Sequence, residues 1–221
     1  AGRTIDERVA LELGVLGQET VGPGGIAYGL RTVPVALDVA RRVAALAPGA
    51  WVISFTNPAG MITEAMQRVL GDRVVGICDS PVGLAARAAR ALGISGPVVP
   101  DYVGLNHLGW LRGLSVDGVD RLPELLADDA RLTRIEEARL LGPAWVRALG
   151  ALPNEYLYYF YRNREAVAAI RSAPQSRGEY LCEQQERFYA AAAADPASAW
   201  ELWTATRAER DASYMAESRE A

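Results

Sequence analysis

Five polar side chains with possible chemical roles each come directly after, or within two positions of, a short apolar run. They belong to Asn57, to Cys78 and Asp79, and to Asn106 and His107, the only histidine of the chain. A thiolate and an imidazole are common ligands of divalent transition metals, and two protein ligands leave coordination positions open for substrate oxygens. Taken alone, Cys78 and His107 are each better explained by packing. Their joint placement after successive runs favours a metal site.

Short strands and helices alternate in the first half of the chain, and they would position these five side chains. The apolar patterns predict strands at 51–55, 73–78 and 98–105 and helices at 31–46, 62–70 and 81–92. This order, with short connections, is typical of a doubly wound parallel sheet. Ligands bind such sheets at the carboxyl ends of the strands, so we expect the three polar strand ends to meet in one crevice.

The second half of the chain predicts mainly helices. A strand pair is expected at 111–119, and helices are expected at 122–127, 131–149, 154–170, 175–194 and 196–217. Residues 156–161 include five aromatic side chains, for which core packing is the first interpretation and a subunit interface the second. We therefore predict two domains, at residues 1–110 and 111–221.

The composition excludes several classes of protein. The 221 residues include 23 basic residues, all of them arginine, and 27 acidic residues, which gives a net charge of −4. Phosphate binding along a nucleic acid needs a net basic surface, which this balance does not favour. No apolar run reaches the roughly 18 to 20 residues of a membrane-spanning helix, and no signal segment opens the chain. We expect a cytoplasmic protein that binds neither nucleic acids nor membranes.

A glycine-rich segment at residues 17–25 precedes the first predicted helix. Four of its nine residues are glycine. Glycine allows the backbone to approach a ligand closely or to adopt positive φ, and the composition alone does not distinguish these two uses.

Six ordered motifs resemble glycoside hydrolase family 4, the NAD- and manganese-dependent phospho-glycosidases. The resemblance spans almost the whole chain and looks most like the 6-phospho-β-glucosidases. The motifs are Arg3 with Asp6 and Glu7, Gly-Gln-Glu-Thr at 17–20 with the glycines at 24 and 25, Phe-Thr-Asn-Pro-Ala-Gly at 55–60, Cys-Asp-Ser-Pro at 78–81, Gly-Leu-Asn-His-Leu at 104–108 and the run at 153–159.

The resemblance implies an α/β fold in which a Rossmann-like parallel sheet, of the lactate/malate dehydrogenase kind, is followed by a mainly helical α+β second domain. In this family an opening strand and a Gly-x-Gly-Ser dinucleotide loop precede the position of Arg3. The chain begins without methionine or a leading strand. We therefore interpret it as an internal fragment, and we expect weak NAD binding or none if that loop is absent from the molecule.

The resemblance also implies a redox-assisted hydrolysis in place of the usual paired-carboxylate displacement. NAD takes a hydride from C3 of the sugar, a base removes the acidified C2 proton, and the aglycone leaves by elimination. Water then adds to the double bond and the hydride returns. The expected substrate is a phosphorylated disaccharide or glucoside, and the expected assembly is a homodimer or homotetramer.

Two sets of residues match metal and substrate positions of the family. Cys78 and His107 match its metal ligands, and a Mn²⁺ ion there would polarise the C2 and C3 oxygens of the sugar. Substrate binding is implied for Arg3 and Asn57, and we extend it to Asp79 and Asn106, which are the polar neighbours of the metal ligands.

The catalytic base is implied to be a tyrosine of the aromatic run. Tyr156 is our first choice and Tyr159 our second, and Glu19 matches the carboxylate that raises the basicity of the tyrosine. A free phenol has a pKa of about 10, so a tyrosine base needs a nearby cation such as the metal.

Three alternatives stay open. Asp79 stands where the β-glucosidase branch usually has asparagine, and an aspartate there is more similar to the 6-phospho-α-glucosidases. The strand end at 54–58 also resembles the lactate/malate NAD dehydrogenases, which would need an acidic partner for the histidine and no metal. A non-enzymatic alternative is a truncated scaffold that assembles through its aromatic helix.

Overall fold

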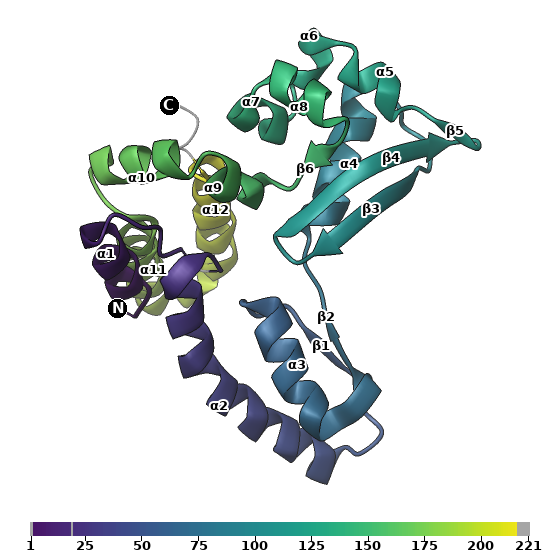
Figure 1. Cartoon of the computed structure of the whole chain (residues 1–221). Coiled ribbons are helices and arrows are strands. Elements are labelled where there is room, and N and C mark those ends of the chain that lie inside the picture. Colours follow the sequence, from purple (N-terminus) through teal and green to yellow (C-terminus); the bar gives the residue numbers. More distant parts are fainter. Residues whose placement is uncertain (1, 19, 216–221) are drawn as a thin grey trace.

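The computed structural model describes residues 2–18 and 20–215. The first part of the chain folds into four long helices, a short 3₁₀ turn and two strands (Figure 1). These elements are α1 (Gly2–Glu12), α2 (Gly22–Leu46), β1 (Val52–Ser54), α3 (Ala59–Leu70), η1 (Gly71–Arg73), β2 (Val74–Gly76) and α4 (Ser80–Ala91).

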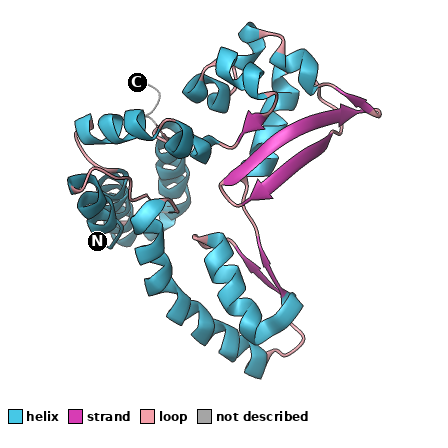
Figure 2. Cartoon of the chain, in the orientation of Figure 1, coloured by secondary structure: helices cyan, strands magenta, loops and turns pink. Residues whose placement is uncertain are grey.

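The second part begins with strands and continues as helices (Figure 2). Its elements are β3 (Val99–Leu105), β4 (Leu108–Val116), β5 (Val119–Asp120), α5 (Leu122–Leu126), α6 (Asp129–Leu132), α7 (Glu136–Leu141), α8 (Pro143–Leu149), β6 (Leu152–Pro153), η2 (Glu155–Leu157), α9 (Tyr158–Tyr161), α10 (Asn163–Ser172), α11 (Arg177–Ala194), η3 (Pro196–Ser198) and α12 (Ala199–Ala212). The predicted domain boundary at residue 110 falls within β4 and stays a prediction.

A parallel strand pair with its crossover helix confirms the βαβ unit expected from the sequence. β1 pairs with β2 in parallel, and α3 connects them. One face of this unit is buried. Ile62 and Met66 from α3 and Val74 from β2 belong to an apolar cluster that also includes residues of α2. The other face leaves Ile53 at 67% exposure, flanked by exposed Trp51 and Phe55. Among the described residues, this strand pair is therefore covered on one face only.

The third predicted strand does not join the parallel sheet, which corrects the expected single doubly wound sheet. β3 pairs with β4 in antiparallel fashion, and Leu105 opposes Leu108 across a two-residue turn formed by Asn106 and His107. β4 also pairs with β5 and β6. Two adjacent strands joined by so short a turn can only be antiparallel, because a parallel partner needs a crossover connection.

The main apolar core lies where α4 and the helices α5 to α8 cover the sheet of β3, β4 and β6 (Figure 1). Leu84 from α4, Leu111 and Leu114 from β4, and Ile135 and Val146 from the helical layer are fully or almost fully buried. Complete burial of a leucine or isoleucine side chain contributes about 1.5–3 kcal/mol each. This core fixes the β3–β4 turn, which carries His107, relative to the start of α4.

Two helices predicted as continuous are broken into shorter ones. The region 131–149 divides at Gly142, where φ is +90° and Pro143 begins α8. Proline suits the first turn of a helix but not its interior, so the break is encoded in the pair Gly142 and Pro143. The region 154–170 divides because Arg162 leaves the helical conformation between α9 and α10.

Helix α1 packs against α11, so the start of the chain contacts a segment about 170 residues later (Figure 1). The buried carboxylate of Glu7 accepts a hydrogen bond of 2.8 Å from the backbone N–H of Gly178 in the first turn of α11. The Ser176 hydroxyl and the Glu179 carboxylate form a capping box at the same turn. Glu7 thereby satisfies a backbone donor that the helix itself leaves free.

The glycines of residues 17–25 are used for close backbone packing. A Cβ on Gly24 would lie 2.7 Å from the carbonyl carbon of Gly17, and one on Gly25 would lie 2.8 Å from that of Thr20. Gly22 has φ of +64° at the start of α2. Of the two uses left open by the composition, positive φ occurs at Gly22, and the close approaches of Gly24 and Gly25 are to the chain itself.

We expect Gly24→Ala to destabilise the fold by about 1–3 kcal/mol, because the added methyl group meets backbone that cannot move aside. Gly49→Ala is the matched control, since a Cβ on Gly49 has no neighbour within 4 Å among the described residues. Urea unfolding of both variants measures the difference. Equal midpoints for the two variants would show that the loop packs differently.

Candidate functional site

The thiol of Cys78 and the imidazole of His107 lie side by side. Cys78 follows β2 directly before α4, and its Sγ is 3.6 Å from Nε2 of His107. In a tetrahedral zinc site, metal–sulfur and metal–nitrogen distances of about 2.3 Å and 2.1 Å place the two ligand atoms about 3.6 Å apart. The two side chains therefore fit a shared divalent metal. Within residues 2–18 and 20–215 no group of three or more His, Cys, Asp and Glu side chains could hold a metal ion.

His107 is oriented by the turn that carries it and by Thr20. The residue has φ of +58°, in the left-handed region, and its Nδ1 lies 2.7 Å from Oγ1 of Thr20. With Nδ1–H donating to that hydroxyl, the lone pair of Nε2 points toward Cys78, as metal ligation requires. Burial lowers the pKa of His107 to about 4, which leaves the ring neutral at pH 7.

Replacing Thr20 by valine should weaken metal binding by about 10-fold or more, because partners of ligating histidines contribute this much to metal affinity. Valine keeps the shape of the side chain and removes only the oxygen that holds Nδ1. Titration of the chain with Co²⁺, followed by absorbance, measures the change. Thr133→Val, which removes an exposed hydroxyl bonded to its own helix, is the control. Unchanged affinity in the Thr20 variant would contradict this role.

Tyr156 lies flat against the imidazole. The two ring centroids are 3.6 Å apart and the rings are within 5° of parallel. The Asn154 side chain accepts a 3.0 Å hydrogen bond from the N–H of Tyr156, and the Asn154 N–H donates to the carbonyl of Gly109. The segment that carries Tyr156 is thus hydrogen-bonded to β4, the strand that begins directly after His107.

A second phenol contacts Tyr156 from the end of the described chain. Tyr214 shares a side-chain hydrogen bond with Tyr156, and burial raises the pKa of Tyr214, with Tyr156 as the next cause. Tyr214 is therefore neutral at pH 7.

The two carboxamides predicted to bind substrate also come together. Nδ2 of Asn106 lies 3.5 Å from Oδ1 of Asn57, so the end of β1 meets the β3–β4 turn. Oδ1 of Asn106 is buried without a hydrogen-bond partner among the described residues. A buried acceptor of this kind is costly unless a donor reaches it, and a sugar hydroxyl is a suitable donor.

The remaining predicted residues are placed as follows. Asp79 is exposed beside Cys78, and its charge raises the pKa of His107 against the larger effect of burial. Tyr159 is buried, with its ring edge-on to Tyr156 at 6.0 Å. Arg3 lies on α1, where its Nε donates to Glu7 at 2.7 Å. Glu19 lies outside the described residues. The structure thus brings Asn57, Cys78, Asn106, His107 and Tyr156 together, while their roles stay predictions.

Sequence reasoning assigned no role to Thr20 or Asn154, although both orient members of this cluster. Thr20 stands in the Gly-Gln-Glu-Thr motif, and that placement was the available signal. Asn154 begins a short helical turn, and asparagine at such a position commonly accepts a hydrogen bond from the backbone two residues later.

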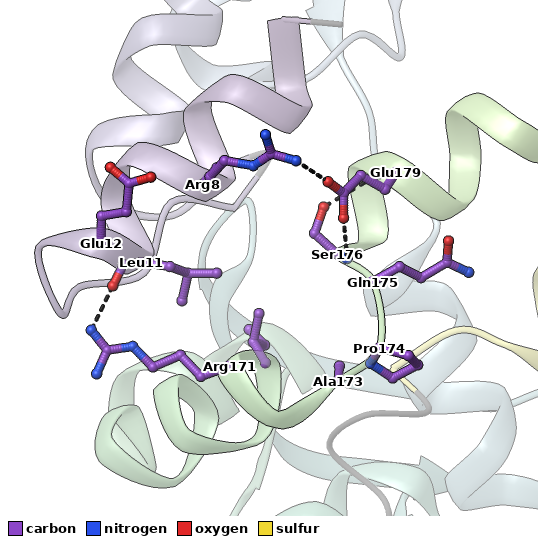
Figure 3. A pocket seen from close by; sticks show the side chains of 10 residues that line it. Arg8, Leu11, Glu12, Arg171, Ala173, Pro174, Gln175, Ser176 and Glu179 are labelled. Atoms are coloured by element: carbon purple, nitrogen blue, oxygen red, sulfur yellow. Dashed lines mark hydrogen bonds and ion pairs between the residues drawn. The ribbon is translucent and has the colours of Figure 1, made fainter.

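A separate pocket of about 360 Å³ lies between α1 and the α10–α11 connection (Figure 3). The guanidinium of Arg8 pairs with Glu179, and that of Arg171 donates to the carbonyl of Leu11. The charged groups of Arg8, Glu179 and Arg171 are thus engaged with the protein itself. The described lining residues of the pocket belong to α1, α10, α11 and the segment between the last two helices, and not to the Cys78 cluster.

Both halves of the chain match one enzyme family. Residues 1–94 match family 4 glycosyl hydrolase, and residues 102–221 match the C-terminal domain of family 4 glycosyl hydrolase. The chain belongs to glycoside hydrolase family 4. The family resemblance and the fold class predicted from the sequence are thereby confirmed.

Relatives in this family include enzymes of both anomeric classes. The 6-phospho-beta-glucosidase of Escherichia coli (strain K12) is 39% identical over 176 residues, which cover 75% of this chain and 39% of the relative. The maltose-6'-phosphate glucosidase of Bacillus subtilis (strain 168) is 36% identical over 206 residues, which cover 85% of this chain and 45% of the relative. The chain therefore spans less than half the length of these curated family 4 relatives.

A solved family 4 structure shows the same arrangement of elements. The 6-phospho-beta glucosidase from Thermotoga maritima, determined with manganese, NAD+ and glucose-6-phosphate, has a TM-score of 0.73 at 25% identity. The match covers 84% of this chain and 44% of that chain.

Among the described residues of this chain, no helix has both the length and the apolar character needed to cross a bilayer.

Proposed function

We propose that this protein hydrolyses 6-phospho-β-glucosides with the help of a divalent metal, Mn²⁺, and NAD. The observation that carries the proposal is the 3.6 Å approach of Cys78 Sγ to His107 Nε2, with Tyr156 stacked on the same imidazole. This arrangement puts a metal-binding pair and a phenol side by side. The names of the family 4 relatives supply the substrate class, a sugar carrying a 6-phosphate.

Cys78 and His107 are the residues that would hold the metal in this proposal. A bound divalent metal acts there as a Lewis acid on sugar oxygens. The neutral imidazole, with its pKa lowered to about 4, is in the ligating form throughout the neutral range. The hydrogen bond with Thr20 keeps Nε2 of His107 directed at the site.

Tyr156 is the proposed base, which would take the proton from C2 of the sugar at its phenolic oxygen. Stacking on His107 holds the ring beside the metal pair, and the Asn154 cap fixes its backbone. Proximity to a metal cation favours the deprotonated phenol, which is the form that acts as a base. Asn57 and Asn106 would orient the sugar hydroxyl groups through their carboxamides.

NAD enters the proposal through the family 4 relatives. The described residues contribute the carboxyl ends of β1 and β2, where dinucleotides lie in sheets of this kind. The glycines of residues 17–25 pack against the chain itself. We therefore assign the metal and sugar contacts to the described residues of this chain.

The choice of the β anomer follows the Gly-Gln-Glu-Thr and Phe-Thr-Asn-Pro-Ala-Gly motifs. Asp79 favours a second candidate, hydrolysis of 6-phospho-α-glucosides, because an aspartate at this position resembles that branch of the family more than the β-glucosidase branch, which usually has asparagine. A cytoplasmic location and a homodimer or homotetramer complete the proposal as expectations from the sequence.

Release of p-nitrophenol from p-nitrophenyl β-D-glucoside 6-phosphate tests this function, with the α anomer assayed in parallel. We expect release that requires both Mn²⁺ and NAD and that favours the β anomer. Preference for the α anomer would replace the β assignment with the second candidate. Release that persists without Mn²⁺ or without NAD, or no release of either anomer with both present, would contradict the proposal.

A further inference from the structure

A buried hydrogen bond connects the segment of Cys78 with the segment of Tyr156. The Ser80 hydroxyl donates to Oε1 of Glu155 at 2.5 Å, although the two residues are 75 positions apart. Ser80 is 9% exposed and Glu155 is 5% exposed. A hydrogen bond between buried groups is stronger electrostatically than one in water, and this one is shielded from water.

The position of this pair in the chain relates it to the site. Ser80 is the first residue of α4, two residues after Cys78, and Glu155 directly precedes Tyr156. The other tie of the same segment, from the Asn154 N–H to the Gly109 carbonyl, reaches the strand that follows His107. The Ser80–Glu155 bond is thus the direct link between the Cys78 loop and the segment that carries Tyr156.

Packing does not account for this pair. Burial of a carboxylate is costly, and its cost is offset only by hydrogen bonds or a paired cation. Oε2 of Glu155 is buried and has no hydrogen-bond partner among the described residues. The neighbouring guanidinium of Arg87 is already bonded to the buried Glu137. An apolar pair of similar size would fill the same space at lower cost, so the polar pair has another role.

We propose that Ser80 and Glu155 are positioning residues that set the place of the Cys78 thiolate relative to Tyr156. The inference rests on the proposed function, because it takes Cys78 as a metal ligand. We call this hydrogen bond the Ser80–Glu155 clamp. Without it the Cys78 loop loses a direct tie to the segment that carries Tyr156, so the place of the Cys78 thiolate relative to Tyr156 is held less firmly.

Titration of the chain with Co²⁺ tests the clamp, with the thiolate-to-metal absorption band as the signal. Ser80→Ala is expected to weaken Co²⁺ binding by about 10-fold or more and to reduce the band, as loss of a group that orients a ligand does. Ser80→Thr keeps the hydroxyl and should restore binding. Glu155→Gln keeps an acceptor for that hydroxyl and should remain close to wild type. Ser172→Ala, which removes an exposed hydroxyl bonded to its own helix, is the matched control.

A second measurement separates failure of the clamp from failure of the metal site. In the Cys182→Ser background, which removes the exposed thiol, the rate at which a disulfide reagent modifies Cys78 is measured without metal. Ser80→Ala should raise this rate several-fold, with Ser80→Thr and Ser172→Ala unchanged. If wild type binds no Co²⁺, the metal proposal fails and this rate alone decides on the clamp. An unchanged rate, or wild-type Co²⁺ affinity in Ser80→Ala, would overturn the inference.

Discussion

Cys78→Ser should lower the affinity of the chain for Mn²⁺ or Co²⁺ by more than about 100-fold, because it removes one of the two proposed protein ligands. Loss of a partner that only orients a ligand already costs about 10–100-fold. Serine has nearly the shape of cysteine but is not deprotonated near neutral pH. The fold should therefore remain, since Cys78 is only partly buried and is not a core residue. Equilibrium dialysis against Mn²⁺ measures the loss.

Cys182→Ser is the matched control for this variant. Cys182 is an exposed residue on α11, so its replacement should leave metal affinity unchanged. Equal losses in both variants would point to metal bound by thiols in general. Full retention of affinity in Cys78→Ser would remove Cys78 from the metal site.

Tyr156→Phe should lower kcat for p-nitrophenyl glucoside 6-phosphate by about 10²–10⁴-fold, the usual contribution of a general base. Phenylalanine keeps the ring that stacks on His107 at 3.6 Å, so Co²⁺ affinity should stay near that of wild type. The combination of lost turnover and retained metal binding identifies a proton-transfer role. A change in packing around the metal would alter both.

Tyr159→Phe is the comparison that separates the two candidate tyrosines. Tyr159 is buried at 5% exposure and meets Tyr156 edge-on, one ring further from the imidazole. Its variant should keep most of the activity. Loss of turnover in Tyr159→Phe with activity retained in Tyr156→Phe would move the role of base to Tyr159.

Much of the site was predictable because strand ends are visible in a sequence. Apolar runs that end in Asn57, Cys78 and His107 mark three positions. The structure brings Asn57 within 3.5 Å of Asn106, the neighbour of His107, and Cys78 within 3.6 Å of His107. The route of the third segment was not predictable in the same way. Periodicity identifies a strand at 98–105, but its partner depends on whether residues 106 and 107 turn the chain back, and these residues are not a typical hairpin pair such as Asn-Gly.

The supporting contacts were less accessible to sequence reasoning. Thr20 and His107, which share one hydrogen bond, are 87 positions apart, and Ser80 and Glu155, which share another, are 75 positions apart. No periodic pattern connects such pairs, because each depends on how separate elements pack. The break at Gly142 and Pro143, in contrast, is a local signal, and the apolar spacing of 131–149 obscured it.

An X-ray structure of the chain crystallised with Mn²⁺, with anomalous differences collected at the manganese edge, tests the central claim most directly. We expect one anomalous peak within bonding distance of both Sγ of Cys78 and Nε2 of His107, with the ring of Tyr156 beside it. A peak at other side chains, with Cys78 and His107 unligated, would contradict the proposed metal site and the function built on it.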